Sequence, residues 1–158
     1  LLAASVELNV VDGVILPNLK MQGTEEACAY LDEEGRCSIH PYRPGICRLF
    51  PLGRYYENGG FSYFLQTGEC AKENRSKIKV SKWIDTPDLT RNQQFTLQWH
   101  DLLHAMEERL TGEDEGKQRE ENLLLLRLFY LLPYEGTIDF YTQFTERMEH
   151  WNGQNGQI

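Results

Sequence analysis

The sequence contains no apolar stretch long enough to cross a membrane. Its longest apolar run, residues 123–132, has ten residues and includes Arg127, whereas a transmembrane helix needs about 20. No signal peptide is recognisable at the start. We therefore predict a cytoplasmic protein without a membrane partner. Because the chain starts at Leu1 rather than Met, we expect its natural N-terminus to lie upstream.

Positive charge and the common nucleotide-binding motifs are scarce as well. The 16 Lys and Arg residues stand against 24 Asp and Glu, which gives a net charge of -8 and argues against a nucleic-acid partner. The sequence has no P-loop, dinucleotide fingerprint, nucleophile elbow or paired-carboxylate motif. It therefore points to no enzyme class, and it leaves a protein partner or substrate unknown.

The residues that are present predict one α+β domain. A chain of 158 residues with 41% hydrophobic content can bury one core. Asp12-Gly13, Gly35 and Asn58-Gly59 mark the tips of three successive hairpins, because these residues accept the positive φ angles of tight turns. We predict a hairpin-rich part over residues 1–85, with Cys28 and Cys37 flanking the second turn and Cys47 and Cys70 flanking the third.

The second half changes to a helical period and predicts three helices packed on the hairpins. We expect the first helix to end near Gly112, and the second to end before Pro133 and, being apolar all round, to be buried. Residues 86–151 form this helical part, and 152–158 a frayed tail. The apolar positions are, in order, Phe95, Trp99, Leu102, Met106 and Leu110; residues 123–131; then Tyr141, Phe144, Met148 and Trp151.

Four cysteines, Cys28, Cys37, Cys47 and Cys70, all fall in the first half of the chain. Thiolates at the bases of two hairpins could converge on one metal site, and four of them suit zinc or an iron–sulfur cluster. No CxxC pair is present, so the spacing leaves two alternatives open. These are ordinary buried cysteines and a pair of disulfides.

The most basic stretch of this acidic chain surrounds two of the cysteines. "CSIHPYRPGICRLFPLGR", residues 37–54, has three arginines and no acidic residue. Arg43 and Arg48 could offset the negative charge of a thiolate site, and His40 could add a ligand or cover it. The arginines could equally pair with acidic residues across the second hairpin or dock an anionic substrate. Those acidic residues are Glu25, Glu26, Asp32, Glu33 and Glu34.

Residues 28–52, "CAYLDEEGRCSIHPYRPGICRLFPL", resemble the YkgJ-type cysteine-cluster family of bacteria and archaea, over about residues 1–85. The family is described as zinc- or iron-chelating or as containing an iron–sulfur cluster. The matching positions are Cys28, Cys37, Ile39, His40, Arg43, Pro44, Cys47, Arg48, Phe50, Pro51 and, further on, Cys70.

The resemblance implies that the four cysteines bind Zn²⁺ or an iron–sulfur cluster, with no preference between the two. Its members usually open with a CxxCxxxCC motif that this chain lacks, so further ligands are expected before Leu1 or the motif has been lost. The family also includes part of flagellin lysine N-methylases. The implied functions are a metal-binding domain, a redox or methyl-transfer enzyme beside a cluster, and a purely structural zinc module.

A second possible ligand pair lies in the first expected helix. "WHDLLH" places His100 and His104 one turn apart, with Asp101 between them. The pattern is similar to HExxH, but Asp is shorter than the Glu that acts as base there, and no third ligand follows. We expect a solvated or half-buried helix face.

Overall fold

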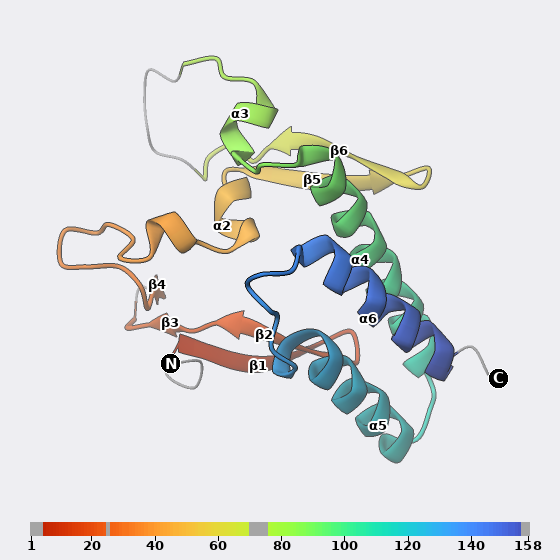
Figure 1. The fold of residues 1–158 in the computed structure, drawn as a ribbon. Helices are drawn as coiled ribbons and strands as arrows, with labels where there is room; N and C mark the ends of the chain where they lie inside the picture. Colours follow the sequence, from red (N-terminus) through yellow and green to blue (C-terminus); the bar gives the residue numbers. More distant parts are fainter. Residues whose placement is uncertain (1–4, 25, 70–75, 156–158) are drawn as a thin grey trace. The chain divides into compact units, whose positions relative to one another are not determined.

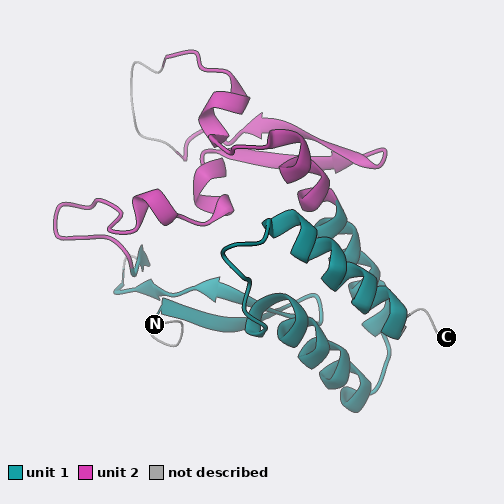
Figure 2. Ribbon diagram, in the orientation of Figure 1, with its two compact units in different colours: residues 1–29, 98–158 teal, residues 30–97 magenta. Residues whose placement is uncertain are grey.

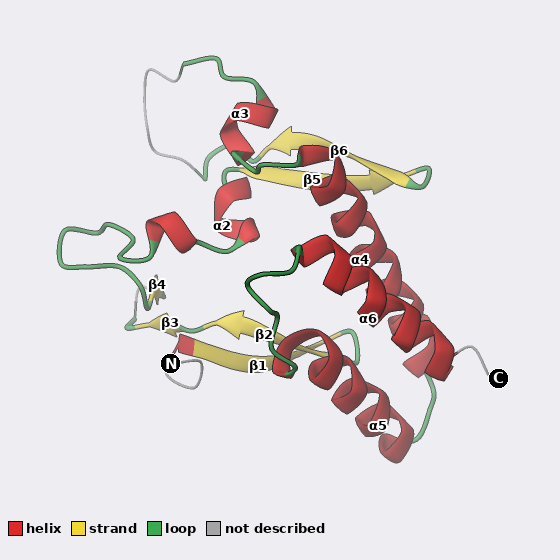
Figure 3. Ribbon diagram, in the orientation of Figure 1, coloured by secondary structure: helices red, strands yellow, loops and turns green. Residues whose placement is uncertain are grey.

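The computed structural model of the chain describes residues 5–24, 26–69 and 76–155. The fold class is α+β as predicted, with antiparallel strand pairs first and helices after them (Figures 1 and 3). The chain divides into two compact units (Figure 2). We name residues 1–29 with 98–158 the helical unit, and residues 30–97 the loop unit. The expectation of a single domain stays a prediction.

The helical unit begins with two short antiparallel strand pairs. β1 (Val6–Val11) pairs with β2 (Val14–Leu19) through the expected Asp12-Gly13 turn, whose φ angles are 51° and 80°. Both angles are positive, as a type I′ turn requires. β3 (Met21–Gln22) then pairs with β4 (Ala27–Cys28).

Three predicted helices follow, and two of them start earlier than the apolar pattern indicated. α4 spans Leu89–Leu110, and Gly112 has a φ of 83° just beyond its end. α5 spans Glu115–Leu126, because the side chain of Asp114 accepts hydrogen bonds from two backbone N–H groups of its first turn. The capping residue Asp114 therefore sets the start of α5, ahead of its first leucine. At the start of α4, the Asp88 carboxylate accepts a hydrogen bond from Arg91 N–H at 3.0 Å.

α5 continues into a π turn, η2 (Arg127–Leu131), in which Leu132 N–H donates to the Arg127 carbonyl five residues back at 2.9 Å. The last helix, α6, spans Phe140–Asn155. The tail predicted to fray from residue 152 is thus helical to Asn155. Within the described ranges, no helix has the length and apolar character of a membrane span.

The core of the helical unit lies among its helices. Trp99 packs edge-on against Phe129, with ring centroids 5.1 Å apart. The second helix is buried on one side only, since Leu123 is 55% and Leu131 70% exposed, so the prediction of burial all round is wrong. The buried apolar residues are Val14, Leu102, Met106, Leu110, Leu125, Leu126, Leu128, Phe129, Phe144 and Trp151.

Buried polar side chains of this unit bond to backbone groups. Asn122 accepts a hydrogen bond from Ile15 N–H at 2.6 Å and donates to the Gly13 carbonyl at 3.0 Å, which ties α5 to the β1–β2 hairpin. Arg147 donates to the carbonyls of Leu128, Leu132 and Pro133, so it caps the end of η2. These bonds satisfy groups that would otherwise lose hydration without compensation.

The loop unit is built around one hairpin and three short helical turns. β5 (Leu52–Glu57) pairs with β6 (Gly60–Leu65) through the expected Asn58-Gly59 turn, with φ angles of 51° and 70°. The helical turns are η1 (His40–Tyr42), α2 (Gly45–Leu49) and α3 (Val80–Ile84).

α3 was not foreseen from the sequence, and it packs against α2. The indole N–H of Trp83 donates to the Phe50 carbonyl at 3.0 Å, just past the end of α2. In this unit the buried apolar side chains among the described residues are Leu49 and Ile84.

Candidate metal centre

A tight turn leads to the first cysteine of the loop unit. The Asp32 carboxylate accepts hydrogen bonds from the backbone N–H groups of Glu34 at 3.1 Å and Arg36 at 2.7 Å. Gly35 has a φ of 72°, the left-handed conformation expected from its position. Aspartate commonly closes turns in this way, so local sequence alone fixes the loop that ends at Cys37.

Two prolines set the path from Cys37 to Cys47. Pro41 lies in η1, and Pro44 precedes α2 and accepts a hydrogen bond from Cys47 N–H at 3.0 Å. Proline fixes its own φ and has no N–H to give to a strand ladder. The chain therefore forms helical turns here. The prediction that Cys47 stands at a strand base of the third hairpin is wrong, since it lies in α2.

The second predicted hairpin is also replaced by a different pairing. Cys28 lies in β4 and pairs with Met21 of β3, and only an isolated bridge joins Leu31 to Cys37. Gly23, with a φ of 72°, lets the chain turn back directly after β3. Residues 27–28 thus pair with residues 21–22, whereas the sequence pattern predicted that they pair with the residues around Cys37.

The described thiols lie outside the buried core. Cys28 and Cys37 are free and half-buried, and Cys47 is exposed. Cysteine that serves only packing is among the most buried residue types, so ordinary core cysteines do not describe these three. Two disulfides would use all four cysteines, but neither Cys28 nor Cys37 forms a disulfide. Soft thiol donors that solvent can reach fit a zinc or iron–sulfur site.

The predicted convergence of the four thiols stays a prediction. Cys28 belongs to the helical unit and Cys37 and Cys47 to the loop unit, while Cys70 lies outside the described residues. Within residues 5–24, 26–69 and 76–155, no three His, Cys, Asp or Glu side chains form a ready-made ligand group.

The predicted supporting residues of the basic loop contact one another and the backbone. The Arg43 guanidinium contacts the His40 imidazole. Arg48 donates to the carbonyls of Pro41 at 3.3 Å and Asp85 at 3.2 Å, and its Nη1 lies 4.0 Å from the Asp85 carboxylate. Arg48 therefore holds η1, α2 and the end of α3 together. Asp85 was missed in the sequence, because a lone acidic residue far along the chain gives no signal.

The histidine pair of α4 is oriented by carboxylates. His100 Nδ1 lies 3.2 Å from Asp101, and His104 Nδ1 lies 3.5 Å from Glu108. The two ring centroids are 6.3 Å apart. His104 is exposed and His100 half-buried, which agrees with the expected solvated helix face.

The three described thiols of this α+β chain lie outside the core, where a cysteine can act as a ligand or reagent. Comparison with known families points the same way. Residues 8–81 match the CxxCxxCC family model, described as "Putative zinc- or iron-chelating domain". No curated protein and no solved structure matches the chain.

The matched range contains all four cysteines but not the clustered motif in the family's name. The matching model is that of the family indicated by the resemblance of residues 28–52, and its description covers zinc and iron without choosing between them. Cys28, Cys37, Cys47 and Cys70 are the ligand candidates that this chain supplies.

Proposed function

We propose that the chain is a metal-binding domain in which Cys28, Cys37, Cys47 and Cys70 hold Zn²⁺ or an iron–sulfur cluster. The observation that carries the proposal is the exposure of the thiols. Three of the four are described, none of the three is buried, and two lie in the most basic loop of an acidic chain. A thiolate site is negatively charged, and such a loop lowers the cost of holding it.

His40, Arg43 and Arg48 are proposed to support the site rather than to bind the metal. Arg48 is already fixed by backbone carbonyls on two sides, so its charge stays close to α2, the helix that carries Cys47. Bound zinc would supply a structural crosslink or a Lewis acid, and a cluster would supply electron transfer. The protein's part is to hold the thiolates and limit their charge.

A groove of the loop unit, which is partly lined by Ile46, Leu49 and Phe50, bears on the choice between the alternative functions. An enzyme of the redox or methyl-transfer kind would need a pocket beside the cysteines lined by Tyr42, Arg43 or Arg48. The groove is lined by none of these three, so it is not the pocket that this alternative requires. A purely structural zinc module would bury all four thiolates, and the exposure of Cys47 counts against it.

Metal analysis tests the proposal. The full-length protein should be purified without oxygen, and zinc, iron and sulfide measured per chain. We expect stoichiometric zinc, or iron with sulfide and a brown colour, and near-complete loss of that metal in Cys37→Ser and Cys47→Ser. The matched control is His100→Ala with His104→Ala, which removes two ligand-type side chains outside the site and should leave the metal unchanged.

A folded wild-type protein that carries neither metal, or cysteine variants that keep it while the histidine variant loses it, would refute the proposal.

A further inference from the structure

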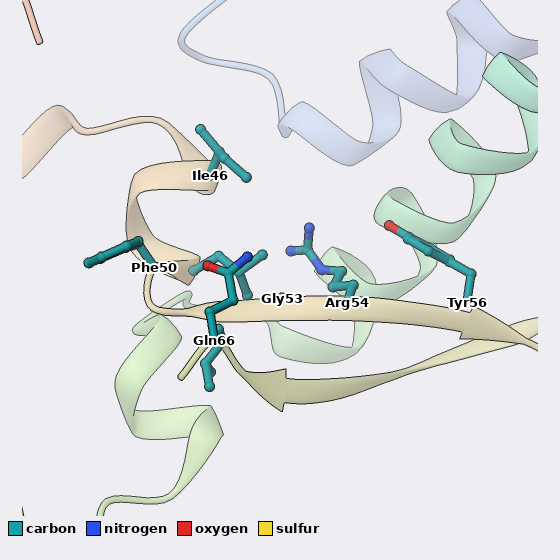
Figure 4. A pocket seen from close by; sticks show the side chains of 8 residues that line it. Ile46, Phe50, Gly53, Arg54, Tyr56 and Gln66 are labelled. Atoms are coloured by element: carbon teal, nitrogen blue, oxygen red, sulfur yellow. The ribbon is translucent and has the colours of Figure 1, made fainter. Parts of the chain in front are cut away.

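A groove in the loop unit combines apolar walls with one arginine (Figure 4). It has a volume of about 400 Å³, within the range of small-molecule pockets. Ile46 and Phe50 form part of its wall and are 67% and 48% exposed. Exposed aliphatic and aromatic side chains around a hollow are unfavourable in water unless something covers them.

Arg54 supplies the positive charge of this groove. It projects from β5 on the same face as Tyr56, and Figure 4 shows its guanidinium rising into the groove with Ile46 on one side and Tyr56 on the other. The guanidinium carbon lies 5.5 Å from the ring centroid of Phe61 and 6.0 Å from that of Tyr63. By the β5–β6 register these two rings lie on the same face of the hairpin as Arg54, where they can hold its cation by cation–π contacts.

Two buried polar atoms at this place lack hydrogen-bond partners in the described part of the chain. They are Nε of Arg54 and the hydroxyl of Tyr63, and these two residues are directly opposite each other in the β5–β6 register. An unsatisfied buried donor costs free energy, so such groups are rare without a ligand, ion or water to bond. Arg48, by contrast, donates to the carbonyls of Pro41 and Asp85. The third such atom among the described residues is Nε of Arg43, a residue that does not line the groove.

We propose that this groove binds a small molecule with an apolar body and a carboxylate, which accepts hydrogen bonds from the Arg54 guanidinium. The planar fork of arginine matches a carboxylate and does not match a neutral group. The apolar walls select the body of the ligand, and the limited volume selects a small molecule over a protein segment. The groove includes no cysteine, so this proposal does not require that the metal site is correct.

The test uses three probes of the same wild-type protein: 4-phenylbutyrate, its uncharged amide, and acetate. Titration calorimetry or ligand-observed NMR should show phenylbutyrate binding at least about tenfold more tightly than either of the others. Acetate has the charge without the apolar body, and the amide has the body without the charge. Equal binding of acid and amide, or no phenylbutyrate binding at about 10 mM, would overturn the proposal.

Variants locate the binding to the groove. Arg54→Gln should weaken phenylbutyrate binding by about tenfold or more, and Arg54→Lys by less, because lysine keeps the charge but loses the fork. Arg36→Gln is the matched control, since it removes the same charge at an exposed loop position outside the groove. Ile46→Asn changes an exposed wall residue, should leave the fold intact, and should also weaken binding.

All variants are compared at equal metal content, because Ile46 adjoins Cys47 in α2. If Arg36→Gln weakens binding as much as Arg54→Gln, the effect is a general one of charge and the proposal is wrong. If a short acidic, aromatic peptide binds more than about tenfold tighter than phenylbutyrate, the groove serves a protein partner and the small-molecule assignment is wrong.

Discussion

The two units of this chain satisfy their buried groups in different ways. Among the described residues, the helical unit holds ten of the twelve buried apolar side chains, whereas the loop unit holds Leu49 and Ile84. The described buried polar atoms without a hydrogen-bond partner all lie in the loop unit, on Arg43, Arg54 and Tyr63. Among the described residues, the helical unit therefore has the larger apolar core, and the loop unit has the buried side-chain polar atoms without partners.

The largest expected effect is on the loop unit when metal is removed. With so small a core of its own, this unit should draw on metal binding for folding energy, which in small zinc domains amounts to about 10–16 kcal/mol. Hydrogen exchange with and without a chelator should therefore show faster exchange over residues 25–75, with α4 to α6 little changed. If the chelator increased hydrogen exchange equally in both units, metal binding would not stabilise the loop unit more than the helical unit.

A smaller effect is expected from breaking the polar tie within the helical unit. Asn122→Ala leaves Ile15 N–H and the Gly13 carbonyl without their partner, and should lower the free energy of unfolding by about 1–3 kcal/mol. Chemical denaturation measures this loss. Asn18→Ala, at an exposed position of β2, is the control and should change stability little. The metal content of both variants should equal that of the wild type, because the hydrogen bonds of Asn122 go to Ile15, Gly13 and Gln118 and to no cysteine.

The smallest effect concerns alkaline pH. Burial, and to a lesser degree the nearby Tyr134, raises the pKa of Tyr130 to about 12, while the unfolded chain ionises near 10. Below pH 10 both states carry the neutral phenol. As the pH rises from about 10 towards 12, the unfolded state ionises first, so the helical unit should lose stability in that window.

Thermal melts of the helical signal between pH 9 and 12 measure this loss. Tyr130→Phe should reduce it, and Tyr55→Phe, at an exposed site on β5, should not. An unchanged pH dependence in Tyr130→Phe would show that another group is responsible.

The sequence predicted those features that depend on residues close together in the chain. Asp12-Gly13 and Asn58-Gly59 specify their turns because few other residues accept two positive φ angles. The three long helices followed from their apolar period, yet their starts did not, because Asp114 caps α5 before its first leucine. Cys47 was misplaced because it was assigned to the flank of the third hairpin from the Asn58-Gly59 turn, without the effect of Pro41 and Pro44 on the chain before it.

Contacts between distant residues could not be predicted from the sequence. The bond of Arg48 to Asp85 joins residues 37 positions apart, and that of Asn122 to Gly13 joins residues 109 apart. Arg54 was noted only as a positive charge near the cysteines. Its significance depends on the cross-strand pairing that places Tyr63 opposite it. For the metal ligands, the matched range contains the four cysteines chosen from the sequence, and both their role and their convergence stay predictions.

The π turn η2 has a consequence for how this chain should be aligned with its relatives. A π turn contains one residue more than an α turn, so each position after Arg127 is displaced by one step, about 100° around the helix axis. A relative with a continuous α-helix would align with this chain on both sides of η2 only through a one-residue gap. Without that gap, exposed positions such as Leu131 would be aligned with buried positions of the relative, and their substitutions would be counted as core changes. The evolutionary selection on the helical unit would then be estimated wrongly.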